Sequence, residues 1–135
     1  MSEGTKIDEI LEFEVEPSFK PRFVVKLVRY HSESDRYCLR CELADYLDPG
    51  SWETQVSEAV VDELLSELGT IRLAPIPDFA MGLDGTTYRV AMNRGWNKLV
   101  VQWWGHVPTQ WVQMVPFLRR VVALAGSRAA GVQVE

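Results

Sequence analysis

The sequence has few of the residues that build catalytic or metal sites. Its 135 residues include two cysteines and two histidines. Neither His31 nor His106 stands in an H-x-x-E or H-E-x-x-H array. No glycine-rich stretch has the lysine and the helix start that hold a phosphate. We therefore expect no catalytic residues, no cofactor and no metal ion.

The two cysteines, Cys38 and Cys41, have the C-x-x-C spacing of redox and zinc sites. Both uses require the two sulfur atoms to converge. The residues around them alternate as in a strand, where side chains three positions apart point to opposite faces. The chain has no second cysteine pair. We interpret them as two independent reduced cysteines, and a metal or disulfide site would require the strand prediction to fail.

Basic residues are outnumbered, and long apolar runs are missing. Fourteen lysines and arginines against nineteen acids give a net charge of −5, which repels nucleic acid and attracts a basic protein partner. No apolar run is long enough to cross a bilayer. The first residues are acidic, whereas a secretory signal begins with a basic end and an apolar stretch. We expect a cytoplasmic protein that binds neither nucleic acid nor membrane.

Strand patterns fill the N-terminal part of the sequence. Residues 10–16 alternate between apolar and acidic side chains, which is typical of a half-buried strand. Residues 22–31 are apolar on both faces and predict a central strand. Residues 36–45 follow a polar turn and alternate again, so they are expected to form a hairpin with residues 22–31. The acids of the first strand are expected on a solvated face: Glu12, Glu14 and Glu16.

A helix is predicted from about residue 52 to residue 68. Ser51 can cap its start, and apolar residues recur at helical spacing along one side. Acids occupy its other sides, so its outer surface is expected to be acidic. We expect three of these acids to contact a partner: Glu58, Asp62 and Glu63.

The remaining segments predict a hairpin and a second helix. Residues 70–82 are apolar and broken by prolines, which suits a brief edge strand and a loop. Turn residues and β-branched content predict a hairpin over residues 86–104. Residues 109–125 carry a wide apolar stripe and predict a helix that is kinked or restarted at Pro116.

This order, β-β-β-α-(β)-β-β-α, predicts an α+β fold. We expect an antiparallel sheet of five to six strands with two helices packed on one face. Residues 1–126 are expected to form one domain, and residues 127–135 a flexible C-terminal tail.

The tryptophans of the stretch VVQWWGHVPTQW divide between core and surface. If the strand runs to Trp104, then Trp103 shares a face with apolar neighbours and enters the core. Trp111 lies on the apolar stripe of the last helix and is expected to enter it too. Trp104 is left half exposed near His106, and Trp96 from the turn can join them. An exposed tryptophan either covers a loop or contacts a partner.

Residues 82–126 contain GLDGTTYRV, VVQWWG and PTQWVQMVPFLRRVVALAG. They resemble the C-terminal half of small uncharacterised bacterial proteins that carry an Asp-Gly-x-x-aromatic strand, a tryptophan-containing strand and a Pro-x-x-Trp helix start. Some proteins of that kind are similar to immunity proteins, which protect cells from secreted toxins by binding them. The resemblance implies a binding role and no catalytic residues.

The sequence is compatible with two main functions and a third possibility. The first is a non-catalytic protein-binding module that neutralises a bacterial toxin, its partner being a basic toxin domain. Its expected contacts are Trp96, Trp104, His106, Glu58, Asp62 and Glu63. The alternative is a small-molecule-binding or enzymatic domain, with a pocket between the sheet and residues 74–85, near Tyr88, Trp104 and His106. A subunit of a larger assembly is a third reading, and the sequence leaves the oligomeric state open.

Overall fold

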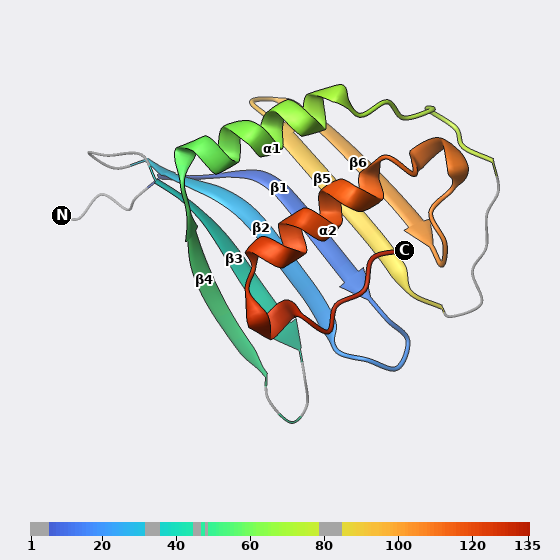
Figure 1. The fold of residues 1–135 in the computed structure, drawn as a ribbon, viewed down its shortest axis with the longest axis horizontal. Helices are drawn as coiled ribbons and strands as arrows, with labels where there is room; N and C mark the ends of the chain where they lie inside the picture. The colour runs from blue at the N-terminus through green and yellow to red at the C-terminus, as the bar shows by residue number, and fades with distance from the viewer. Residues whose placement is uncertain (1–5, 32–35, 45–46, 48, 79–84) are drawn as a thin grey trace.

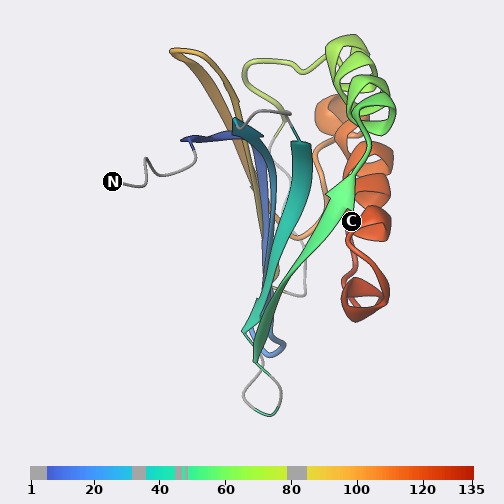
Figure 2. The same ribbon diagram turned by 90° about the vertical axis from the view of Figure 1, so that its left-hand side faces the viewer.

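An open antiparallel sheet carries two α-helices on one face (Figures 1 and 2). The computed structural model describes residues 6–31, 36–44, 47, 49–78 and 85–135. The six strands lie in the order β4-β3-β2-β1-β5-β6. Their bounds are β1 (Lys6–Glu16), β2 (Arg22–His31), β3 (Arg36–Ala44), β4 (Gly50–Val56), β5 (Thr87–Arg94) and β6 (Asn97–Trp104), and the helices are α1 (Glu58–Thr70) and α2 (Met114–Leu124). The predicted α+β class is confirmed.

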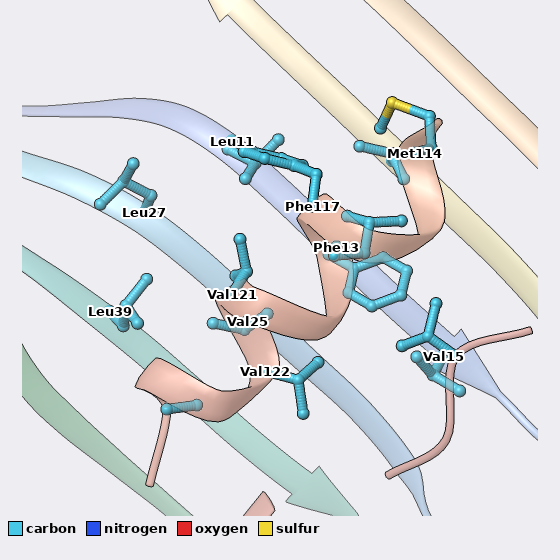
Figure 3. Close-up of a cluster of buried hydrophobic side chains, with 14 of the residues drawn as sticks. Leu11, Phe13, Val15, Val25, Leu27, Leu39, Met114, Phe117, Val121 and Val122 are labelled. Carbon is cyan, nitrogen blue, oxygen red and sulfur yellow. The ribbon is translucent and has the colours of Figure 1, made fainter. Parts of the chain in front are cut away.

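The core lies between the sheet and α2, which crosses the sheet diagonally (Figures 1 and 3). Alternate residues of β1 and β2 point toward the helices, and Phe13 stands opposite Val25. Phe117 and Val121 of α2 are buried over them. Each fully buried side chain of this size contributes about 1.5–3 kcal/mol through the area removed from water. The apolar stripes read from the sequence therefore decide which face of the sheet the helices cover.

The segment before α1 differs from the sequence prediction. Residues 50–56 form β4, an edge strand paired with β3, and α1 begins only at Glu58. The N-cap is Ser57, whose hydroxyl accepts a hydrogen bond from the N–H of Val60 at 3.2 Å, so the predicted cap at Ser51 is wrong. Residues 51–56 alternate between exposed and partly or fully buried side chains, a strand pattern that the cap-like serine concealed.

Two further details differ. The described part of residues 70–82, which ends at residue 78, contains no strand, and residues 79–82 lie outside the described residues. The last helix is interrupted as expected, but earlier than Pro116: a 3-10 turn over Thr109–Trp111 precedes α2. Pro116 then lies in the first turn of α2, where its missing N–H leaves no helical hydrogen bond unmade.

Residues 127–135 pack against the core, which differs from the flexible tail expected. Ala129 and Val134 are buried within the main apolar cluster. The buried side chains of Tyr88 and Trp103 donate hydrogen bonds to backbone carbonyls of the segment, Tyr88 Oη to Gln133 O at 3.3 Å and Trp103 Nε1 to Glu135 O at 3.0 Å. The surface residue Arg119 donates from Nη2 to Val134 O at 2.9 Å. Figure 1 shows this segment returning across the sheet below α2.

The face of the sheet away from the helices carries charges of both signs. Arg22 of β2 contacts Glu14 at 2.6 Å, and Lys26 contacts Glu9 at 3.2 Å. Glu12 stands opposite Lys26 in the register of β1 and β2. The glutamates of β1 therefore lie on a surface face, as predicted, but neighbouring strands supply the opposite charge and the face is not an acidic patch.

Candidate functional site

A wide cleft lies between α1 and the end of the sheet. Its volume is about 1160 Å³, and its walls come from α1, the start of β1 and the β5–β6 turn. Figure 2 shows the reason in the fold: the β5–β6 hairpin leans away from α1 at this end, so the two layers separate. We call this feature the α1 cleft and define it by Asp62 and Leu65 of α1, Ile10 of β1, and Met92 and Leu99 of the hairpin.

Apolar side chains reach solvent in the α1 cleft. Leu65 is 41% exposed and Leu99 is 53% exposed, while Ile10 and Met92 are partly buried below them. The sequence placed Leu65 within the buried stripe of the helix. The β5–β6 hairpin leans away from α1 at this end, so part of the apolar stripe is left uncovered (Figure 2). Exposed apolar side chains gathered in one concave place are typical of a binding surface.

Charged groups line the same cleft. Asp8 lines it, and the Asp8 carboxylate accepts a hydrogen bond from His31 at the paired ends of β1 and β2. The hydrogen bond from His31 lowers the pKa of Asp8, so this carboxylate remains charged to lower pH than an isolated aspartate. Lys98 and Arg94 come from the hairpin wall. The cleft thus offers both signs of charge around an apolar floor.

The three acids predicted on α1 have different surroundings. Glu63 contacts Arg120 of α2 at 2.6 Å, and a further acid of α1, Glu67, contacts the same arginine at 3.0 Å. These contacts raise the pKa of Arg120 and place Glu63 in a helix-to-helix ion pair. Glu58 and Asp62, by contrast, make no ion pair with the other residues described in the structure. Of the three predicted acids, Glu58 and Asp62 therefore carry a charge that no described residue neutralises. Asp62 also lines the α1 cleft.

The predicted aromatic contacts are not brought together. Trp96 lies in the two-residue turn between β5 and β6 and is fully exposed, whereas Trp104 ends β6 and is 41% exposed. They are eight positions apart along the chain, which corresponds to about 26 Å of extended strand. His106 lies beyond Trp104, with its Nδ1 atom 3.9 Å from Glu135 Oε2. The predicted contact set therefore spreads over both ends of β6 and one face of α1.

The other tryptophans of the stretch are placed as expected. Trp103 is buried in the core and stacks against Tyr88, with ring centroids 5.2 Å apart. Trp111 is partly buried against the core, and its Nε1 donates a hydrogen bond to Ala74 O at 2.8 Å. The strand period in the sequence was sufficient to place Trp103, whereas Trp111 lies in the 3-10 turn before α2 and not on the apolar stripe of that helix.

A smaller pocket of about 300 Å³ lies between the β1–β2 loop and the C-terminal segment. Phe23 and Tyr88 line it, as does Thr86, the residue before β5. Trp104 and His106, which the alternative function grouped with Tyr88, are not among its lining residues. The ring of Tyr88 is held by stacking on both Phe13 and Trp103, which is a packing role.

Cys38 and Cys41 are both buried and free, on opposite faces of β3. Cys38 packs with Val28 and Tyr30 on the face away from the helices, whereas Cys41 belongs to the main core. Burial raises the pKa of Cys41 to about 12 and also raises the pKa of Cys38. The prediction of two separate cysteines in a strand is confirmed.

Comparison with protein families, with curated proteins and with solved structures finds no match to this chain. Among the described residues, no three or more histidine, cysteine or acidic side chains are grouped so as to hold a metal ion. Neither of the described helices has the length and apolar character needed to cross a membrane.

Proposed function

We propose that this protein is a non-catalytic protein-binding module that holds a segment of its partner in the α1 cleft. The observation that carries the proposal is the exposure of Leu65 and Leu99 inside a concave surface. At about 1160 Å³ the cleft exceeds the roughly 300–1,000 Å³ typical of small-molecule sites. An apolar floor with charges of both signs at its rim suits a polypeptide, which carries both kinds of side chain.

The free acids of α1 favour a partner with basic side chains. Glu58 and Asp62 are one turn apart on α1 and have no ion pair among the described residues. The net charge of −5 adds a long-range attraction for a basic protein. The partner segment is accordingly proposed to place apolar side chains against Leu65 and basic side chains beside Asp62.

The resemblance of residues 82–126 to immunity-like proteins supplies the class of partner to test first. That partner is a toxin domain, bound directly and thereby neutralised. The encounter would occur in the cytoplasm, where the thiols of Cys38 and Cys41 stay reduced. The α1 cleft requires no catalytic group for this role, because binding alone blocks the toxin.

The test compares two variants of the cleft with a matched control. The wild-type chain, Leu65→Glu and Asp62→Lys serve as baits, together with the product of a neighbouring toxin gene as first prey. We expect Leu65→Glu to weaken binding by about tenfold or more, because a charge replaces a buried apolar contact. Asp62→Lys should chiefly slow association, and added salt should reduce that difference.

Glu16→Lys is the control, since it makes the same change of charge at an exposed position at the far end of β1. It should bind like the wild type. Equal binding by all four chains would remove the α1 cleft from the interface. A wild-type chain with no measurable affinity for that toxin would contradict the proposed toxin-binding function itself.

A further inference from the structure

The two edge strands of the sheet differ in how they meet solvent. At one edge, β4 exposes Ser51, Glu53 and Gln55, polar side chains of the kind that discourage contact between sheet edges. At the other edge, β6 exposes large apolar side chains. They are Leu99 at 53%, Val100 at 43% and Trp104 at 41%, with the fully exposed Trp96 in the turn before them. In the described part of the chain, β6 pairs only with β5.

The hydrogen-bonding groups on the free side of β6 follow from its pairing with β5. The N–H of Gly105 donates to the carbonyl of Thr86 at 2.8 Å. Bonded and non-bonded pairs alternate along an antiparallel ladder, so Val100, opposite Ala91, belongs to a non-bonded pair. The peptide groups of Lys98, Val100 and Gln102 therefore point away from β5, toward the free edge.

We propose that β6 pairs with β6 of a second copy of this chain, antiparallel, about a two-fold axis through Val100. The two sheets then join into one continuous sheet. Val100 stands opposite Val100 of the second copy, and Lys98 stands opposite Gln102. On the helix side, Leu99 stands opposite Val101. Each outward-facing peptide group of this stretch gains a partner.

The exposed tryptophans favour this register. Trp96 and Trp104 are each four positions from Val100. A two-fold axis through Val100 therefore sets Trp96 of one copy beside Trp104 of the other, and all four exposed apolar side chains gain an apolar neighbour. No like charges stand opposite one another, because Lys98 faces Gln102.

Other registers match the side chains less well. A shift of pairing by one residue would place every side chain on the wrong face. An axis through Gln102 sets Lys98 opposite His106 and leaves Trp96 without a partner. An axis through Val101 sets Lys98 opposite Trp104, and Trp96 is again left over. The axis at Val100 is the register in which the stretch from Trp96 to Trp104 is complementary to itself.

The dimer contact shares Leu99 with the α1 cleft, but different variants test the two surfaces. Val100 does not line the cleft, whereas Asp62 and Leu65 belong to α1. Self-association and partner binding can thus fail or succeed separately, although Leu99 borders both surfaces. A two-fold dimer would carry two α1 clefts and would bind two partners.

Sedimentation equilibrium of the purified chain tests the proposal. We expect a mass of twice 15.4 kDa at micromolar concentrations. Val100→Lys should be monomeric, because the axis sets two lysines directly opposite each other. Ser51→Lys places a lysine on the other edge and should remain dimeric. Circular dichroism and thermal melting establish that each variant is folded.

A charge-complementation experiment tests the register. Val100→Glu alone should also be monomeric, for the same reason as Val100→Lys. An equimolar mixture of the two variants should recover the dimer, since opposite charges then meet at the axis. A mixture that stays monomeric overturns the register through Val100.

Two outcomes overturn the edge contact itself. One is a wild-type chain that remains monomeric up to high micromolar concentration, which leaves the edge of β6 to a strand of another protein. The other is a folded Val100→Lys variant that dimerises as tightly as the wild type, which places the dimer contact elsewhere.

Discussion

Cys41 lies beneath the helices with its Sγ atom 3.9 Å from the carbonyl of Leu39. Burial raises the pKa of its thiol to about 12, so the reactive thiolate is scarce at neutral pH. Cys38 is shielded on the opposite face by Val28 and Tyr30, and burial raises its pKa as well. Neither thiol is placed for nucleophilic chemistry.

Alkylation with iodoacetamide at pH 8 checks this residue-scale conclusion. In the native protein both thiols should remain unmodified over a period in which a free cysteine peptide reacts completely. In denaturant both should react, which serves as the control. Rapid native labelling of Cys41, measured by mass spectrometry of the tryptic peptides, would contradict the buried, protonated thiol.

At the scale of the element, α1 shows how one hydroxyl fixes the start of a helix. Ser57 accepts a hydrogen bond from Val60 N, and the first-turn residue Glu58 adds a favourable charge at the same end. Ser51 has the same side chain but lies exposed in β4. The two serines therefore form a natural pair for measuring what the cap contributes.

We expect Ser57→Ala to lower the free energy of unfolding by about 1 kcal/mol, the usual effect of removing an N-cap. Ser51→Ala should change it by less than about 0.5 kcal/mol, as exposed substitutions usually do. Urea denaturation followed by circular dichroism measures both values. A larger effect at Ser51 than at Ser57 would mean that α1 begins where the sequence first suggested.

At the scale of the whole molecule, the last nine residues complete the core. Val134 is buried, and Arg119 donates two hydrogen bonds to its carbonyl, at 2.9 Å and 3.1 Å. Trp103 and Tyr88 also donate to carbonyls of the segment, as described above. Removing it would take away these hydrogen bonds, that of the buried Trp103 Nε1 among them, and would expose the apolar surface that the segment covers.

Deletion of residues 127–135 should therefore lower the free energy of unfolding by about 3 kcal/mol or more. The buried Trp103 N–H that loses its acceptor alone costs about 1–3 kcal/mol, and the burial of Ala129 and Val134 is lost as well. Arg128→Ala is the control. It removes a contact between the Arg128 guanidinium and the ring of Trp52, at 4.6 Å, and should cost about 1 kcal/mol or less. A deletion variant as stable as the wild type would indicate a loose tail.

Much of this fold was predictable from side-chain periodicity. The alternation in β1 and β3 sorted Phe13, Cys38 and Cys41 correctly, and Trp103 was placed inside by the same rule. The edge strand β4 was missed because Ser51 resembles a helix cap and an edge strand has little apolar character to distinguish it.

The candidate sites were less predictable, because they depend on which elements meet. Sequence identified Asp62 as a surface acid, but it could not show that Arg120 would engage Glu63 and leave Asp62 free. It counted Leu65 in a buried stripe, because the separation of α1 from the hairpin is a property of the sheet's curvature. Contacts between distant elements carry no local pattern in the chain.

The pairing of β1 with β5 has a consequence for how quickly the molecule forms. Four of the five strand contacts join neighbours along the chain, whereas Glu16 of β1 meets Thr87 of β5 across a long intervening stretch. Closing that loop lowers the conformational entropy of the chain before the contacts between β1 and β5 form and compensate for the loss. The hairpins can therefore nucleate early and separately, and the search that brings β1 beside β5 sets the folding time of the whole sheet.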